Sequence, residues 1–236
     1  MIATVINAAA VFLGSILGLV FKNRIKTRYT DAVTKGVALF VIVIGLMNAM
    51  KTENILCVVI CVIAGIVAGE MLKIENGLEY FGETVKKKLF RGREAGRFTE
   101  GFMGATLLFC VGAMTITGSM DAGIRGDYTI LLSKSAMDGV MALTLAATMG
   151  VGVVFSGFSV LICQGLLTVL AVWAGPVLPG PAVTEMGAVG GLIIAGIGFN
   201  MLGITTGNKK LNIGNMLPAL FLPILYIPCE IFIRGL

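Results

Sequence analysis

The chain has 236 residues, of which 57% are hydrophobic and only 13% are charged, and its mean hydropathy is +0.96. A soluble domain is about a quarter charged, so this composition argues against a soluble protein. Histidine is absent, so the chain lacks the commonest metal ligand and general base. The formal net charge is +5. The basic residues lie in loops beside apolar segments, so membrane topology explains them better than nucleic-acid binding does.

Long runs without a charged residue indicate membrane-spanning helices. A span needs about 20 apolar residues to cross a hydrocarbon core roughly 30 Å thick. Such runs cover 2–21, 101–120, 139–184, 186–207 and 211–229. They lack the apolar–polar alternation of membrane barrel strands. The predicted fold is therefore an all-α, polytopic transmembrane helix bundle, with one integral membrane domain over residues 1–236.

Eight helices are predicted, at about 2–21, 34–50, 54–72, 100–119, 129–154, 157–174, 185–205 and 211–232. The second and third are short and joined by "KTEN", which predicts a hairpin. The fifth and sixth are separated only by a weak turn at Ser156 and Gly157. The segment "GPVLPGP" is a loop, because its three prolines cannot continue a helix.

The distribution of Lys and Arg predicts the orientation. No basic residue precedes the first apolar run, so we interpret it as a retained helix rather than a signal peptide. Five basic residues fall in 22–35, seven in 73–99, and two more are Lys209 and Lys210. These are alternate loops, so the positive-inside rule predicts that all three are cytoplasmic and that both termini lie outside.

The loop 73–99 has an amphipathic pattern of its own. Leu78, Phe81, Val85 and Leu89 recur at helical spacing, with a basic cluster beside them. A helix that lies on the anionic lipid headgroups of the cytoplasmic leaflet has this pattern. A solvated charged linker is the alternative.

Two segments resemble each other, which suggests an internal repeat. Residues 36–50 and 189–203 each carry an Ile-Gly step followed by an asparagine, Asn48 or Asn200. Each is followed by a loop and a helix that ends near a glutamate, Glu70 or Glu230. The predicted topology makes helices 1–3 and 6–8 inverted copies, an architecture found in secondary transporters. Chance similarity in a Gly-, Ile- and Leu-rich chain is the alternative.

Small residues predict close helix packing. "GSILG", "GIVAG" and "GAVGG" place glycines four residues apart, which lets helix backbones approach in lipid, within the bundle or between copies in a homo-oligomer. The five cysteines all lie in apolar runs. They are expected to be buried side chains rather than disulfides.

Polar residues within apolar runs cost free energy unless they are satisfied, so they are candidates for a transport path. Five of them are amides: Asn7, Asn48, Gln164, Asn200 and Asn215. Lys134 and Asp138 share one helical face. We expect them to face the interior and to pair with each other or with a residue such as Asn48 or Asn200. A solvated pair in a plain loop is the alternative, and an interhelical hydrogen bond is the alternative for each asparagine. The candidate path comprises Asn48, Ser119, Asp127, Lys134, Ser135, Asp138, Asn200 and Asn215, and the candidate helix-break glycines are Gly112, Gly118, Gly126, Gly190, Gly191 and Gly198.

The same residues carry a resemblance to a known family. "LLFCVGAMTITGSMDAG", "GD", "LLSKSAMDG", "EMGAVGGLIIAGIGFNMLGI" and "IGNMLPAL" resemble the YdfK/YqgA-like family of bacterial inner-membrane proteins, also called domain of unknown function 554. One departure is Ala113, where the family often has proline. The resemblance covers nearly the whole chain. It implies a multi-pass protein of the bacterial inner membrane with a transport function, and it supplies no substrate.

The sequence bears on three classes of function. A transporter or channel for a small solute or ion is favoured by the repeat, the glycines and the polar residues. No Walker-type P-loop is present, so ATP hydrolysis is not expected, and neither a cofactor nor a metal is expected. An enzyme is disfavoured, because an intramembrane serine protease needs a histidine partner and only Asp138 is embedded for an aspartyl one. A structural or regulatory membrane protein without transport activity is the alternative.

Overall fold

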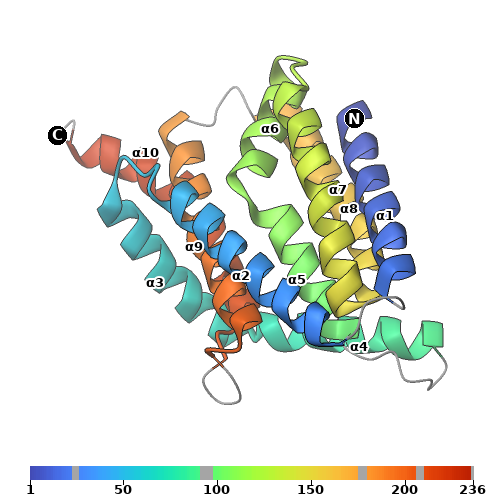
Figure 1. Ribbon diagram of the computed structural model, residues 1–236. Coiled ribbons are helices and arrows are strands. Elements are labelled where there is room, and N and C mark those ends of the chain that lie inside the picture. Colours follow the sequence, from blue (N-terminus) through green and yellow to red (C-terminus); the bar gives the residue numbers. More distant parts are fainter. Residues whose placement is uncertain (23–26, 91–97, 175–179, 206–209, 235–236) are drawn as a thin grey trace.

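The structure is a computed structural model that describes residues 1–22, 27–90, 98–174, 180–205 and 210–234 (Figure 1). All regular secondary structure within these residues is helical. The elements are α1 (Ile2–Lys22), α2 (Thr27–Ala49), α3 (Ile55–Leu72), α4 (Ile74–Phe90), α5 (Phe98–Val111), α6 (Ala113–Ile124), α7 (Thr129–Met149), α8 (Gly152–Ala174), α9 (Gly180–Leu202), the 3-10 helix η3 (Ile213–Leu220) and α10 (Pro223–Arg234).

The number of apolar helices confirms a polytopic bundle. In the described part of the chain, α1, α2, α3, α7, α8 and α9 are each long and apolar enough to span a membrane. Two more candidates are bent pairs, α5 with α6 at 51° and η3 with α10 at 42°. If each bent pair is one span, the total is eight, as predicted.

The break between α5 and α6 lies at Gly112, one of the predicted helix-break glycines. Its backbone is extended, with φ −64° and ψ 149°. The hydroxyl of Thr115 donates to the carbonyl oxygen of Phe109 at 2.9 Å, which satisfies one carbonyl that the break releases. Gly126, with φ +68°, lies in the turn between α6 and α7.

The other predicted break glycines lie inside continuous helices, so that prediction is wrong for them. Gly118 lies within α6, and Gly190, Gly191 and Gly198 lie within α9. A side chain at any of these positions would collide with a neighbouring helix. Their small size therefore serves close packing in the bundle and does not interrupt the helix.

Several helix boundaries also differ from the prediction. Helix α2 begins at Thr27 rather than at about 34, and α9 begins at Gly180, so Pro181 of the predicted loop lies in its first turn; residues 175–179 of that loop lie outside the described residues. The fifth and sixth spans are separated at Gly150, whose φ of +93° ends α7, and Ser156 and Gly157 lie inside α8. The last span is not one continuous helix over 211–232, because η3 ends at Leu220 and a new helix begins at Pro223. Proline has no N–H to donate and is suited to the first turn of a helix.

The central helix is α9, whose apolar span is 83% buried, whereas the spans of α2 and α3 are 22% and 28% buried. It contacts α2, α5, α6, η3 and α10 (Figure 1). The contacts of Gly198 with Ala38 and of Gly191 with Ala49 set α9 antiparallel to α2. The exposed apolar faces of α2 and α3 are suited to lipid.

Each helix of the first predicted repeat runs antiparallel to its counterpart in the second. Contacts of Gly165 with Met1 and Gly157 with Phe12 set α8 against α1, and contacts of Gly65 with Ala219 and Gly69 with Asn215 set α3 against η3. An inverted repeat requires these opposite directions. The superposition of the two triplets stays a prediction.

The closely spaced glycines pack within the chain. Gly14 and Gly18 of α1 meet the backbones of Gly139 and Leu143 on α7. The contacts of Gly65, Gly69 and Gly191 are likewise internal. These faces therefore give no support to a homo-oligomer.

The five cysteines are free thiols. Cys57, Cys61 and Cys110 are buried, and Cys163 is partly buried. Cys229 is exposed, so the expectation of burial is wrong for this residue.

The amphipathic segment forms helix α4, so the alternative of a solvated linker is wrong. It lies across one end of the bundle, and the N-terminus lies toward the other end (Figure 1). Leu78 and Val85 pack against the core formed by Phe98 and Phe102. Phe81, on the same predicted face, remains 56% exposed.

Candidate functional site

The two bent spans meet on one face of α9. A Cβ at Gly190 would lie 2.5 Å from the carbonyl oxygen of Val111 and 3.3 Å from Leu220. Val111 is the last residue of α5 and Leu220 is the last residue of η3. Interrupted helices expose backbone groups that can bind ions or solutes, and such backbone is tolerated at membrane depth only inside protein or around a cavity.

A buried ion pair lies on α7. The ammonium of Lys134 pairs with the carboxylate of Asp138, and the two residues are only 4% and 8% exposed. This placement agrees with the expected interior pair, and the alternative of a solvated loop is wrong. A charge at the bilayer centre costs about 2.5–3.5 kcal/mol on insertion scales, so such a pair needs polar neighbours.

Neighbouring helices supply these polar groups. The amide Nδ2 of Asn7 on α1 donates to Asp138 Oδ2 at 3.0 Å and to Gln164 Oε1 on α8 at 2.8 Å. Gln164 Nε2 in turn lies 3.5 Å from the hydroxyl of Thr4. Thr4, Asn7 and Gln164 are fully buried. We call Thr4, Asn7, Lys134, Asp138 and Gln164 the polar network.

The network region has spare hydrogen-bonding capacity. Within the network, Asn7 Oδ1 is buried and has no partner among the described residues. Elsewhere in the bundle the same holds for the hydroxyls of Ser15 on α1 and Ser119 on α6, which no described hydrogen bond joins to the network. A buried polar atom without a partner costs about 1–3 kcal/mol. Such atoms inside a bundle are suited to a water or a ligand.

Other predicted path residues lie outside the network. Ser135 is buried, but its hydroxyl donates to the carbonyl of Leu131. Asp127 is exposed and accepts from the N–H and hydroxyl of Thr129 at the start of α7. Asp127 is therefore a capping residue, and no described contact joins it to the buried pair.

The three predicted asparagines also lie apart from the pair. Asn48 accepts from Lys51 at 3.3 Å. Asn200 bonds to the backbone of Leu211, and so holds the segment after α9. Asn215 accepts from the backbone N–H of Glu75 at 2.7 Å. The buried residues pair with each other, as one of the two expected alternatives states, and the asparagine that joins them is Asn7 of the first helix rather than Asn48 or Asn200.

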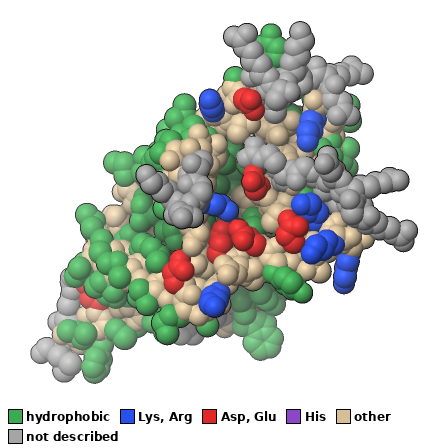
Figure 2. All heavy atoms as spheres, turned by 90° about the horizontal axis from the view of Figure 1, so that it is seen from below, with side chains coloured by type: hydrophobic (Ala, Val, Ile, Leu, Met, Phe, Trp, Pro, Cys, Tyr) green, Lys and Arg blue, Asp and Glu red, His purple; other side chains and the backbone are tan. Residues whose placement is uncertain are grey.

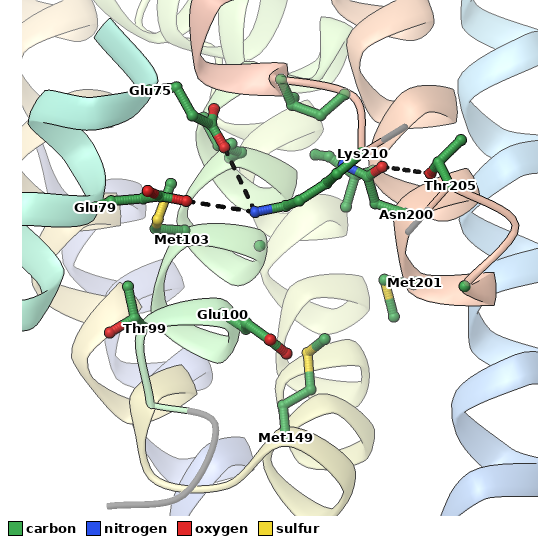
Figure 3. A pocket seen from close by; sticks show the side chains of 15 residues that line it. Glu75, Glu79, Thr99, Glu100, Met103, Met149, Asn200, Met201, Thr205 and Lys210 are labelled. Atoms are coloured by element: carbon green, nitrogen blue, oxygen red, sulfur yellow. Dashed lines mark hydrogen bonds and ion pairs between the residues drawn. The ribbon is translucent and has the colours of Figure 1, made fainter. Parts of the chain in front are cut away.

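A second polar region lies at the α4 end of the bundle, where acidic and basic side chains gather on one face (Figure 2). It contains a cavity of about 350 Å³, which we call the α4 pocket (Figure 3). Its charged lining residues are Glu75, Glu79, Glu100 and Lys210, and its lining also includes Met103, Met149, Met201, Leu107 and Ile197. This pocket was not predicted from the sequence, because its charged residues fall in separate segments of the chain.

The ammonium of Lys210 lies between two carboxylates of α4. It is 3.7 Å from Glu75 Oε1 and 3.5 Å from Glu79 Oε1 (Figure 3). Glu75 is 6% exposed, and its Oε2 accepts from the N–H of Gly214 at 2.5 Å. Burial raises the pKa of Glu75, whereas the Gly214 N–H and Lys210 oppose that rise.

Another buried carboxylate lies toward the opposite end. Glu185 of α9 is 1% exposed and accepts from the hydroxyl of Thr52 at 2.5 Å. It also accepts from the backbone N–H groups of Glu53 and Asn54, at 2.8 and 3.1 Å. Glu185 therefore joins α9 to the α2–α3 turn, a structural role that the sequence analysis did not find.

Helix α5 links the α4 pocket with the polar network. Glu100 and Leu107 line the pocket. Helix α5 also contacts α7, which carries Lys134 and Asp138. Among the described residues, no three His, Cys, Asp or Glu side chains are grouped as metal ligands.

The fold and these sites define a polytopic helical membrane protein with bent spans and buried charges. The chain belongs to the family described as protein of unknown function DUF554, which matches residues 2–227. It is similar to the uncharacterized membrane protein YdfK of Bacillus subtilis strain 168, with 30% identity over 99% of this chain and 96% of the relative. It is also similar to the uncharacterized protein YqgA of Escherichia coli K12, with 30% identity over 92% of each chain. No solved structure matches the chain.

Proposed function

We propose that the protein is a transporter or channel that moves a small solute or ion across the bacterial inner membrane. The observation that carries this proposal is the Lys134–Asp138 pair, buried inside the bundle and hydrogen-bonded to Asn7, whose own Oδ1 is unsatisfied. Ionisable residues within membrane spans are costly, and they commonly mark ion or substrate pathways. In this proposal, the α4 end of the bundle is cytoplasmic and both termini lie outside. The basic residues of α4 then contact anionic lipid headgroups of the cytoplasmic leaflet.

The arrangement of the spans supports this proposal. The antiparallel helix pairs fit an inverted repeat, and the two bent spans meet at Gly190 of the central helix. Secondary transporters commonly form their sites from discontinuous helices; here η3–α10 belongs to the second predicted repeat, and α5–α6 lies between the two repeats in the chain. Helix α5 runs from the α4 pocket to this meeting point, since its earlier residues line the pocket and its last residue is Val111. The pocket is therefore suited to be the entrance for the solute from the α4 end.

The test is flux into liposomes that contain the purified protein, with a panel of inorganic ions, amino acids and amines. We expect flux of at least one solute and its loss in Asp138→Asn. The matched control is Asp121→Asn, which removes a carboxylate that pairs with Arg125 at the surface. Folding of each variant is checked by size-exclusion chromatography in detergent.

A charge exchange separates a functional site from a structural pair. The double variant Lys134→Asp with Asp138→Lys retains both charges, so it should preserve folding. If the pair only stabilises the bundle, the exchange should also preserve flux. If the pair is a site, flux should be lost. Absence of flux for every solute with well-folded wild-type protein would favour a structural or regulatory role instead.

A further inference from the structure

We infer that the α4 pocket binds a small organic cation, a protonated amine with a short apolar body, and that Lys210 occupies the ammonium position until such a ligand displaces it. This inference rests on the proposed function and names the class of its solute. It depends on three properties of the pocket: how Lys210 is held, the balance of charge, and the apolar lining.

Lys210 is held loosely. Its ammonium is 3.5 Å and 3.7 Å from the nearest carboxylate oxygens of Glu79 and Glu75, whereas a close charge-assisted hydrogen bond is about 2.7–2.9 Å long. The Lys210 side chain is also 43% exposed. The pair with Glu79, whose side chain is 48% exposed, contributes little to stability. A free ammonium at the same place would also keep the buried carboxylate of Glu75 paired, so it can replace the tethered one at small cost.

The charged lining of the pocket is acidic. Among the described lining residues, the two carboxylates of Glu75 and Glu79 surround the one ammonium of Lys210 (Figure 3). Glu75 is held in place by the N–H of Gly214, so its other oxygen is oriented toward the Lys210 ammonium. This arrangement attracts cations and repels anions.

The deeper lining is apolar and adaptable. Met103, Met149 and Met201 line the cavity together with Leu107 and Ile197. Methionine is flexible and polarizable, so it accommodates apolar groups of different shape. The cavity of about 350 Å³ lies at the small end of ligand pockets, which span roughly 300–1,000 Å³. An amine with a short alkyl chain fits this combination better than a bare inorganic ion.

Binding is measured by calorimetry on the full chain in lipid nanodiscs at low salt. The probes are n-butylammonium, its neutral counterpart n-butanol and the anion butyrate. We expect binding of n-butylammonium alone. Glu79→Gln should weaken this binding about fivefold, as expected for one partly exposed charge. Lys210→Ala should strengthen it about fivefold, because the competing ammonium is gone.

Two control variants isolate these effects. Lys86→Ala removes an ammonium that pairs with Glu83 on α4 but does not line the pocket, and Glu53→Gln removes a carboxylate at the other end of α3. Neither should change the affinity for n-butylammonium. If Lys210→Ala is unstable, Lys210→Gln retains most of the stem without the charge and should also bind more tightly.

The results separate this inference from the transport proposal. Failure of n-butylammonium to bind wild type and both Lys210 variants would overturn the inference, as would equal binding of n-butanol. Flux of another solute that n-butylammonium does not inhibit, without amine binding, would count against the inference alone. Amine binding without flux of any solute would uphold the inference and count against transport.

Discussion

Asn54 donates a hydrogen bond from Nδ2 to Glu230 Oε2 at 2.6 Å, and an equivalent bond joins Asn212 to Glu70 Oε1 at 3.2 Å. Asn54 and Asn212 immediately precede α3 and η3, whereas Glu70 and Glu230 lie near the ends of α3 and α10. The two bonds are reciprocal: α3 begins beside the end of the η3–α10 span, and that span begins beside the end of α3. This relationship favours the repeat over chance similarity.

We expect covalent closure of either reciprocal contact to stop transport, because alternating access moves one repeat against the other. Cysteine pairs at 54 with 230, and at 70 with 212, are placed in a protein that lacks its native cysteines. A short thiosulfonate crosslinker should abolish flux in each, and a reductant should restore it. A pair at 83 and 86 on α4 is the control. Full flux in both crosslinked proteins would show that these spans do not separate.

Replacement of one residue of the buried pair on α7 should lower the free energy of unfolding, and replacement of both should restore most of it. Asp138→Asn leaves the ammonium of Lys134 buried without its counter-charge, so it should lower the free energy of unfolding by about 3–5 kcal/mol. Replacement of both residues, Lys134→Met with Asp138→Leu, should restore most of this stability, because an apolar pair of similar volume is often neutral. Thermal unfolding in detergent measures both effects.

Flux measurements complete this comparison. The double variant should be well folded but inactive if the pair is a site for an ion or solute. Wild-type flux in this variant would contradict the proposed role. Stability of the double variant no better than that of Asp138→Asn would contradict the energetic argument.

The contact of the bent spans with α9 should not tolerate a methyl group. Gly190→Ala places a Cβ 2.5 Å from the carbonyl oxygen of Val111, and overpacking of this kind costs about 1–3 kcal/mol. We expect a lower unfolding temperature and weaker flux. Gly36→Ala is the matched control, since its Cβ meets nothing within 4 Å. Equal stability of the two variants would show that the helices adjust freely at Gly190.

The orientation can be tested with cysteines at two described surface positions in a protein without native cysteines. The positive-inside rule predicts that Lys87→Cys on α4 is cytoplasmic and that Glu53→Cys in the α2–α3 turn is outside. An impermeant maleimide should therefore label only Glu53→Cys in intact cells and both variants after lysis. Labelling of Lys87→Cys alone in intact cells would reverse the topology.

Much of the fold could be predicted because lipid imposes a simple requirement on the chain. Uncharged runs mark the spans, and the i, i+4 spacing of Lys134 and Asp138 places them on one face. The boundary at Gly150 could not be predicted, because many glycines in the same run could adopt its backbone conformation. The break at Gly112 was predicted, but the same prediction also included four glycines that lie inside continuous helices.

The partners of the site residues could not be predicted, because they depend on which helices adjoin. Asn7 is 131 residues from Asp138 in the sequence, yet the two side chains are hydrogen-bonded. Glu75 lies in α4 and Lys210 lies in the segment before η3, and they meet because α4 packs against η3. A single sequence contains no signal for either contact.

The pKa of Glu75 predicts how stability changes with pH. Burial raises this pKa, so the ionised carboxylate is less favourable in the folded protein than in the unfolded chain. The folded protein should therefore lose stability as pH rises from below the ordinary glutamate value to above the raised one. Glu75→Gln retains an acceptor for the Gly214 N–H and should remove this loss. Unfolding temperatures in detergent between about pH 4 and pH 8 measure the slope.

Asp127 supplies a control of opposite sign for this experiment. The hydroxyl and N–H of Thr129 lower its pKa, so its contribution to stability is present above the ordinary aspartate value and is lost as pH falls. Asp127→Asn should therefore destabilise the protein at neutral pH and have little effect in acid, whereas Glu75→Gln should have its larger, stabilising effect at neutral pH. An unchanged slope in Glu75→Gln would show that the Lys210 ammonium and the Gly214 N–H fully offset the burial of this carboxylate.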